Sequence, residues 1–356
     1  MKYVLGRSGA LPLMFIAIAT RLFCEMALLY PAAHNAAWIC PIAGLLLYLP
    51  FAYALQRAAA LGNDSAWGNL EARLPRLLSA LVLIALALLL LLDASSMMDI
   101  IAGTASFSIG DKAVITLELP LAVLLALMVL LGPEASGNNA RIGLYILGAL
   151  LVILALAQIP VYRPGWIVPI LGGGVPSILT GALRCAGTMA LLSLPWLFAV
   201  PDRAQFGPVL WGSVAALLAA ALLLGLQMLS PTFVGTELLR PARMEIILNN
   251  GRVAISLQLL YLLLWYGGFL HLLSAQAVTA ACIIRRLLPG VKLWIVALVE
   301  AIAVFLVSGS ERIQAFFERF AGEWFFPLIG LLLLAAMAVG GFAKGGGRKC
   351  GESNAS

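Results

Sequence analysis

Long apolar stretches, separated by short polar ones, dominate the pattern of this chain. A helix needs roughly 20 apolar residues to cross the hydrocarbon layer of a bilayer, and ten stretches reach about that length. They run near residues 11–31, 37–56, 77–101, 114–132, 142–160, 176–200, 208–230, 254–283, 291–308 and 324–343. The gaps between them are too short for a soluble domain. The pattern predicts an all-α integral membrane protein with ten transmembrane helices.

The ten predicted spans divide evenly into two sets of five. Repeat one covers about 11–160 and repeat two about 176–343, within a single transmembrane domain of residues 1–343. Because five is odd, the two halves would insert with opposite orientation, as in inverted-repeat transporters, whose first helix in each half is broken. We therefore expect a five-plus-five, LeuT-like fold with breaks in spans one and six. The remaining residues, 344–356, are rich in Gly, Ser and Lys and predict a flexible cytoplasmic tail.

Composition and charge fix the expected orientation. With 63% hydrophobic and 11% charged residues, the chain has more apolar surface than a soluble globule can bury. Thirteen Lys and Arg fall on the side that carries both termini, seven fall on the other, and only Arg21 and Arg184 lie inside spans. This bias predicts cytoplasmic termini, and it explains the net charge of +6 without nucleic acid. The first span, interrupted by Arg21, Glu25 and Pro31, is not expected to be a cleaved signal peptide.

The motifs of common enzymes and metal sites are absent from the sequence. Its five cysteines show no CxxC or Cys/His ligand spacing, and neither HExxH nor GxSxG occurs. The three glycines from Gly172 to Gly174 are not followed by the Gly-Lys-Ser/Thr of a phosphate-binding loop. We expect no catalytic activity, no cofactor and no metal.

Charges inside the predicted spans are the best candidates for function, because a charged side chain at bilayer depth is costly. Arg21 and Glu25 are four residues apart, so they share a helix face and can form an ion pair. That pair either contributes to a ligand site or only holds helices together. Arg184 has no acidic neighbour at helical spacing. Its partner would be a backbone carbonyl, a ligand carboxylate, or one of Glu25, Asp93, Asp99, Glu118 and Glu300.

Small and aromatic residues accompany these charges. Gly181, Gly187 and Thr188 surround Arg184 and favour either local unwinding or a close helix crossing. Span eight carries Tyr266 within an aromatic and glycine-rich run, which fits an aromatic gate or ordinary packing. The predicted ligand-binding set is Arg21, Glu25, Asp93, Gly181, Arg184, Gly187, Thr188 and Tyr266.

Several features, in order and spacing over most of the chain, resemble the spore germination permease family. They are Pro31 closing span one, Trp38 opening span two, the run from Pro169 to Ala182, Pro231 with Phe233 after span seven, and Trp265 with Phe269 in span eight. The chain differs from the family pattern in span one, which has no glycine between Phe15 and Tyr30.

The resemblance implies a B subunit of a nutrient germinant receptor, within the amino acid, polyamine and organocation transporter superfamily. A pocket between spans one, three, six and eight would sense a small nutrient such as an amino acid. The implied partners are the receptor's A and C subunits, and the implied location is a spore inner membrane or a cell membrane. Two other hypotheses stay open: a secondary transporter driven by protons or sodium, and a structural scaffold whose charges only hold helices together.

Overall fold

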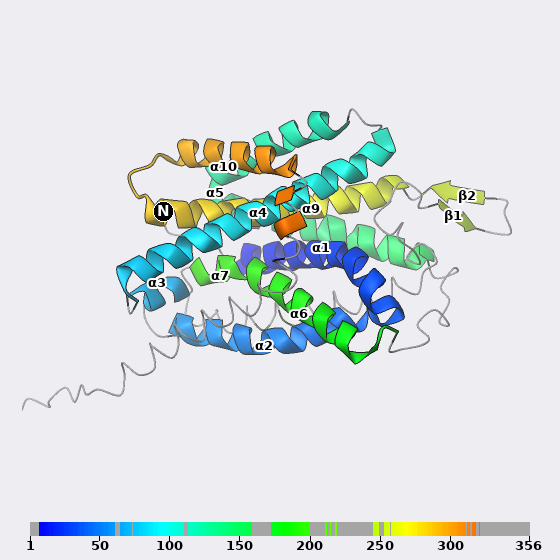
Figure 1. Cartoon of the computed structure of the whole chain (residues 1–356). Coiled ribbons are helices and arrows are strands. Elements are labelled where there is room, and N and C mark those ends of the chain that lie inside the picture. The colour runs from blue at the N-terminus through cyan, green and yellow to red at the C-terminus, as the bar shows by residue number, and fades with distance from the viewer. Residues whose placement is uncertain are drawn as a thin grey trace, which may run out of the picture.

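The computed structural model describes residues 7–60, 65–72, 74–109, 113–158, 172–198, 245–248, 253–256 and 258–310, together with positions 211, 214, 218, 312, 313, 315–317 and 320. Helices dominate these residues and run side by side along one direction of the molecule (Figure 1). They are α1 (Arg7–Ala33), α2 (Ile39–Ala60), α3 (Ala66–Glu71), α4 (Arg76–Ile109), α5 (Ala113–Gln158), α6 (Gly174–Leu192), α7 (Leu194–Phe198), α9 (Gln258–Leu287) and α10 (Leu293–Ser308), with a 3-10 turn at His34–Ala36.

Five helical stretches are long and apolar enough to cross a membrane: Ile39–Gln56, Arg76–Ala102, Glu118–Ile153, Gly174–Leu192 and Leu263–Leu287. Two shorter apolar stretches, Leu11–Leu22 and Leu293–Ser308, accompany them. The protein is therefore a helical membrane protein, as its sequence predicts. Predicted spans seven and ten and the C-terminal tail lie outside the described residues, apart from three positions in span seven. The count of ten spans stays a prediction.

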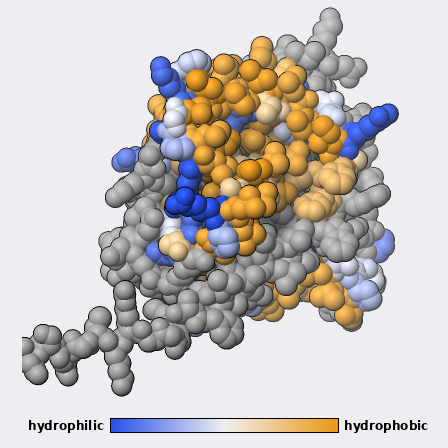
Figure 2. Space-filling view, turned by 60° about the vertical axis from the view of Figure 1, so that its left-hand side comes forward, coloured by the Kyte–Doolittle hydropathy of each residue, from blue (hydrophilic) through white to orange (hydrophobic). Residues whose placement is uncertain are grey.

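Large apolar side chains remain exposed on the outer helices. Leu77, Leu81, Leu88, Leu131, Ile146 and Leu306 are examples on α4, α5 and α10. Figure 2 shows one such face, where apolar surface covers most of the described atoms and hydrophilic residues gather in separate small patches. Such a surface is stable against lipid but not against water.

The element α5 joins two helical segments at Gly132, whose φ of 84° and ψ of −177° are not helical. Pro133 opens the second segment, where its fixed φ and missing N–H suit the first helical position. The second segment runs antiparallel to α9, because Ser136 bonds Ser274, at 2.7 Å, and Gly143 faces His271. The first segment runs antiparallel to α10, because Glu118 lies near Ser308 while Gly132 lies beside Leu293. Two helices therefore correspond to predicted spans four and five.

The first span differs from its prediction. The helix α1 is continuous from Arg7 to Ala33, with no break near Arg21. The lack of glycine between Phe15 and Tyr30 explains the difference, since every residue there can keep helical backbone angles. In span six the interruption falls at Ser193, between α6 and α7, beyond Arg184 rather than beside it.

Two short strands also depart from the predicted all-α pattern. The strands β1 (Glu245–Leu248) and β2 (Val253–Ser256) pair antiparallel, with Glu245 opposite Ser256. In the sequence, two apolar runs rich in β-branched residues flank Asn-Asn-Gly, a composition typical of a hairpin. The predicted start of span eight at 254 therefore moves to Gln258, where α9 begins.

One end of the bundle gathers loops that the sequence assigns to the cytoplasm. Glu71 at the end of α3 accepts a hydrogen bond from Arg286 Nε near the end of α9, at 2.7 Å. The Ser79 hydroxyl of α4 also donates to Glu71, at 3.3 Å. The loops before α4 and after α9 thus lie on the same side, which agrees with the predicted distribution of basic residues.

Candidate functional site

The interior of the bundle holds a charged cluster centred on Asp93 of α4. Its Oδ1 accepts from Arg21 of α1, with Nη2 at 3.1 Å and Nε at 3.2 Å. Its Oδ2 accepts from the side-chain amide of Gln276 on α9. The relative exposures of Arg21, Asp93 and Gln276 are 3%, 1% and 1%. We call these three residues the Asp93 cluster.

Three helices that are distant in sequence meet at this cluster because their packing is close. Around Gly268 of α9, an added Cβ would lie 2.3 Å from the Thr20 hydroxyl oxygen of α1. Only a residue without a side chain fits there. Apolar residues of α1 and α4, including Leu22, Leu90 and Ala94, belong to the same buried core. The cluster is therefore closed to solvent in this conformation.

Because the Asp93 cluster is buried, its ion pair needs additional hydrogen bonds to be stable. An ion pair away from water gains Coulomb energy, but it loses the hydration of both ions, and the pair is tolerated only with good geometry and extra hydrogen bonds. Arg21 uses two nitrogens on one carboxylate oxygen, and Gln276 serves the other oxygen. Gln276 Oε1 has no hydrogen-bond partner in the part of the chain that the structure describes. One acceptor beside the pair is thus available to a further donor.

The structure brings together two of the predicted ligand-binding residues, Arg21 and Asp93. Glu25 lies one turn after Arg21 on α1, but its side chain lies outside the described residues, so its pairing with Arg21 stays a prediction. Among the described residues, Arg21 forms an ion pair with Asp93. Asp93 was a candidate partner of Arg184, and its carboxylate is held by α1 and α9.

The remaining predicted residues lie on α6 and α9. Gly181 allows a close crossing with α2, because an added Cβ would lie 2.6 Å from the Cys40 sulfur. Arg184 is half-buried on α6, and Gly187 and Thr188 are buried beside it. Tyr266 is half-buried on α9. These residues lie on helices that also contact α1, but they are not members of the Asp93 cluster.

The predicted ligand-binding set contains Arg21 and Asp93 but not Gln276. Gln276 joins α9 to α4 through its hydrogen bond to Asp93. Among the described residues, no group of three His, Cys, Asp or Glu side chains could hold a metal ion. The arrangement offers one cation, one anion and an amide in a dry interior.

Long apolar helices that enclose a buried ion pair define a helical membrane protein. No family model and no curated protein sequence matches the chain. Among solved structures, its fold is similar to that of a manganese transporter from Eremococcus coleocola, a mutant form, with a TM-score of 0.53 and 16% identity. The match covers 90% of this chain and 73% of that chain. At this identity the similarity concerns the fold.

Proposed function

We propose that this protein binds a small zwitterionic nutrient of the amino acid class at the Asp93 cluster, and that it acts as the membrane-embedded sensor subunit of a spore germinant receptor. The observation that carries the proposal is the buried pair of Arg21 and Asp93 on different helices. An amino acid presents the same two charges in the opposite sense. Its carboxylate can replace Asp93 at Arg21 while its ammonium replaces Arg21 at Asp93.

This exchange is favourable electrostatically because it leaves no charge without a partner in the interior. A ligand with only one charge would separate Arg21 from Asp93 and replace the ion pair of only one of them, at a cost of about 3–5 kcal/mol. Gln276 Oε1, which lacks a partner among the described residues, can accept from the ammonium. Because Arg21 and Asp93 lie on α1 and α4, their separation by a ligand also moves these helices apart. A sensor needs such a coupling between binding and conformation.

The sensor role rests on the resemblance to the spore germination permease family, which also supplies the expected partners, the A and C subunits, and the spore inner membrane. Arg184 on α6 remains a predicted second contact for the ligand carboxylate. The gene neighbourhood is a direct check of this role, because adjacent genes for A and C subunits would support it.

Binding to the purified full-length protein tests the site. Calorimetry with a panel of amino acids identifies a ligand, and that ligand is then compared with its hydroxy acid and its decarboxylated amine. We expect each analogue to bind at least about tenfold more weakly, a loss of about 1.4 kcal/mol. Arg184→Ala, compared with Arg21→Gln, separates the two arginines. Equal affinity for the amino acid and both analogues would exclude recognition by the pair.

A second candidate function is a secondary transporter of amino acids or related small molecules, driven by protons or sodium, and the transporter-like fold favours it. Uptake of a radiolabelled amino acid into proteoliposomes distinguishes the two functions. Steady concentrative uptake by this chain alone supports the transporter. Binding without uptake, together with a requirement for A and C subunits, supports the sensor.

A further inference from the structure

A second set of buried carboxyl groups lies apart from the Asp93 cluster, where α10 packs against α4, α5 and α9. Its central member is Glu300 of α10, whose side chain is 0% exposed. Neither carboxyl oxygen has a hydrogen-bond partner in the described residues. The neighbours of Glu300 on the same buried face of α10 are apolar, with Val296, Ala297 and Val304 among them.

These surroundings decide which form of Glu300 the packed bundle can hold. An ionised carboxylate here would be shielded from solvent and would have no hydrogen-bond donor or cation in contact among the described residues, so its burial would cost several kcal/mol. A neutral carboxyl group loses much less hydration. The packed interface therefore favours a bound proton on Glu300.

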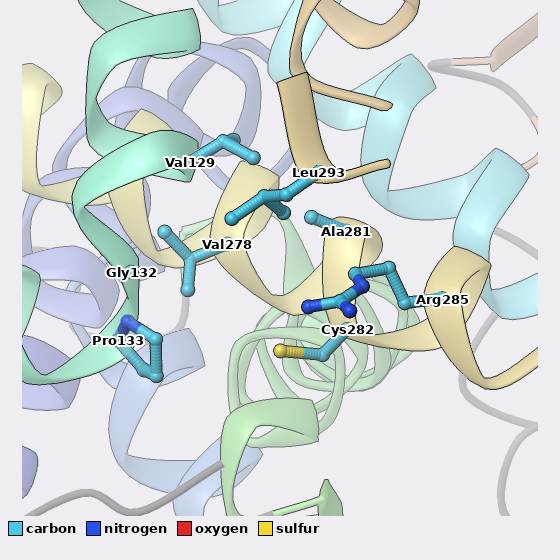
Figure 3. Close-up of a pocket in the computed structure, with 8 residues that line it drawn as sticks. All are labelled: Val129, Gly132, Pro133, Val278, Ala281, Cys282, Arg285 and Leu293. Carbon is cyan, nitrogen blue, oxygen red and sulfur yellow. The ribbon is translucent and has the colours of Figure 1, made fainter. Parts of the chain in front are cut away.

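One end of this interface holds a small cavity of about 10 Å³, which is room for about one water molecule (Figure 3). Leu293, the first residue of α10, lines it together with Cys282 and Arg285 of α9 and Gly132 of α5. Cys282 is close enough to Glu300 for an electrostatic interaction. Arg285, whose Nε is buried without a hydrogen-bond partner among the described residues, is the charged residue in this lining. Glu300 lies seven residues after Leu293, about 10 Å along the helix.

The opposite end of the interface holds two more carboxyl groups. Glu118 of α5 is within hydrogen-bonding reach of Ser308, the last residue of α10, and it interacts electrostatically with Asp99 of α4. Glu118 is buried and Asp99 is half-buried. Ser308 lies eight residues after Glu300, about 12 Å along α10. A water-sized cavity therefore lies on one side of Glu300, and two carboxyl groups lie on the other.

We propose that Glu300 is a proton-binding site of this membrane domain. The proton is held while α10 is packed against α4, α5 and α9, and the carboxyl releases it to water when the interface opens at either end. The charged and titratable neighbours are Cys282 and Arg285 on α9, Glu118 on α5 and Asp99 on α4. The site makes the position of α10 sensitive to pH, and it is independent of nutrient binding at the Asp93 cluster.

Infrared spectroscopy of the full-length protein in lipid nanodiscs tests the bound proton directly. At about pH 7, ordinary exposed carboxyl groups are ionised, so a neutral carboxyl band reports a buried acid. We expect this band in the wild type, the same loss of intensity in Glu300→Gln and Glu300→Leu, and full intensity in Glu134→Gln, a control at an exposed glutamate of α5. No band in the wild type, or a band of unchanged intensity in both Glu300 variants, would overturn the proposal.

The pH dependence of unfolding gives a second readout. Because the packed state favours the neutral acid, the wild type should become less stable as pH rises, while Glu300→Gln should not. The wild-type unfolding constant should increase, relative to the Gln variant, by up to about tenfold per pH unit in the range where Glu300 is protonated only in the folded state. Parallel curves would show that Glu300 exchanges no proton on unfolding. Glu118→Gln, measured alongside, identifies any contribution from the other buried glutamate.

Discussion

At the residue scale, the Asp93 cluster is stabilised because its opposite charges compensate each other, not because any one contact is strong. Both side chains are almost fully buried, so each charge is stabilised by the other and not by solvent. Removing one partner leaves an uncompensated charge in the interior, which is far worse than removing both. This asymmetry distinguishes a structural pair from one that a ligand can open.

Single and double substitutions measure the difference between removing one partner of the pair and removing both. We expect Arg21→Gln and Asp93→Asn each to destabilise the protein by about 3–5 kcal/mol. The double variant should recover most of that loss, because no net charge remains buried. Thermal unfolding in detergent provides the comparison. If the double variant also keeps full function, as the scaffold hypothesis requires, the pair is structural and the proposed ligand site is wrong.

Some charges near the Asp93 cluster can be identified from the sequence, but which residues pair with one another cannot. Arg21 stands out in sequence because a charge within an apolar span is unusual. Its helical neighbour Glu25 is equally easy to find, since spacing alone decides it. Asp93 lies 72 positions from Arg21, and Gln276 lies 183 positions from Asp93. Such partners depend on which helices pack together, and no local pattern of one sequence encodes that choice.

At the scale of elements, glycine determines how closely the helices approach. In α5, an added Cβ on Gly143 would lie 2.2 Å from His271 Nε2 of α9, whereas a Cβ on Gly148 would meet nothing within 4 Å. The two positions belong to the same helix and differ only in their surroundings. They form a matched pair for testing the crossing of α5 and α9.

Alanine at these positions should act in opposite directions. Gly143→Ala forces His271 or the helix to move, and we expect it to destabilise the protein by about 1–3 kcal/mol. Gly148→Ala adds helix propensity without a clash and should be neutral or stabilising by up to about 1 kcal/mol. Chemical denaturation in detergent compares the two variants. Equal effects would contradict the observed crossing.

The turn at Gly132 supports a further prediction. Its φ of 84° and ψ of −177° lie in a region that is essentially restricted to glycine. Gly132→Ala should therefore cost about 1–3 kcal/mol, with a loss in thermal stability that Gly148→Ala does not show. A mutant as stable as the wild type would mean that the two segments of α5 are not separated by this backbone conformation.

Elements were predicted well where composition alone decides them. The break between spans four and five follows from Gly132 and Pro133, and the structure has it. The break expected in span one came from the inverted-repeat pattern, not from local residues, and α1 is continuous. The strand β2 was missed because its apolar residues also fit the start of a transmembrane span, and β1 falls in the predicted loop before that span.

At the scale of the whole molecule, the packing of two loops agrees with the orientation that the distribution of basic residues predicts. Thirteen Lys and Arg fall on the predicted cytoplasmic side. The contact between Glu71 and Arg286 joins two of the predicted cytoplasmic loops at one end of the bundle. The turn between α9 and α10 belongs to that end, and Ser308 ends α10 towards the other.

The two ends of α10 provide a direct test of this orientation. Gly290 and Gly309 are exposed, flank the helix, and have no atoms within 4 Å of an added Cβ. Cysteine at either position should therefore fold normally. In intact cells, a membrane-impermeant maleimide should label Gly309→Cys but not Gly290→Cys, which should react only after the membrane is opened.

The native cysteines set the background of that experiment. Cys24, Cys40 and Cys185 are buried and Cys282 is half-buried, so we expect slow labelling of these four. Cys350 is replaced by serine in all variants, since it lies in the predicted cytoplasmic tail. Labelling of Gly290→Cys alone in intact cells would reverse the orientation. Labelling of both variants would mean that α10 does not cross the membrane, and the proton-binding site at Glu300 would then lie outside the transmembrane field.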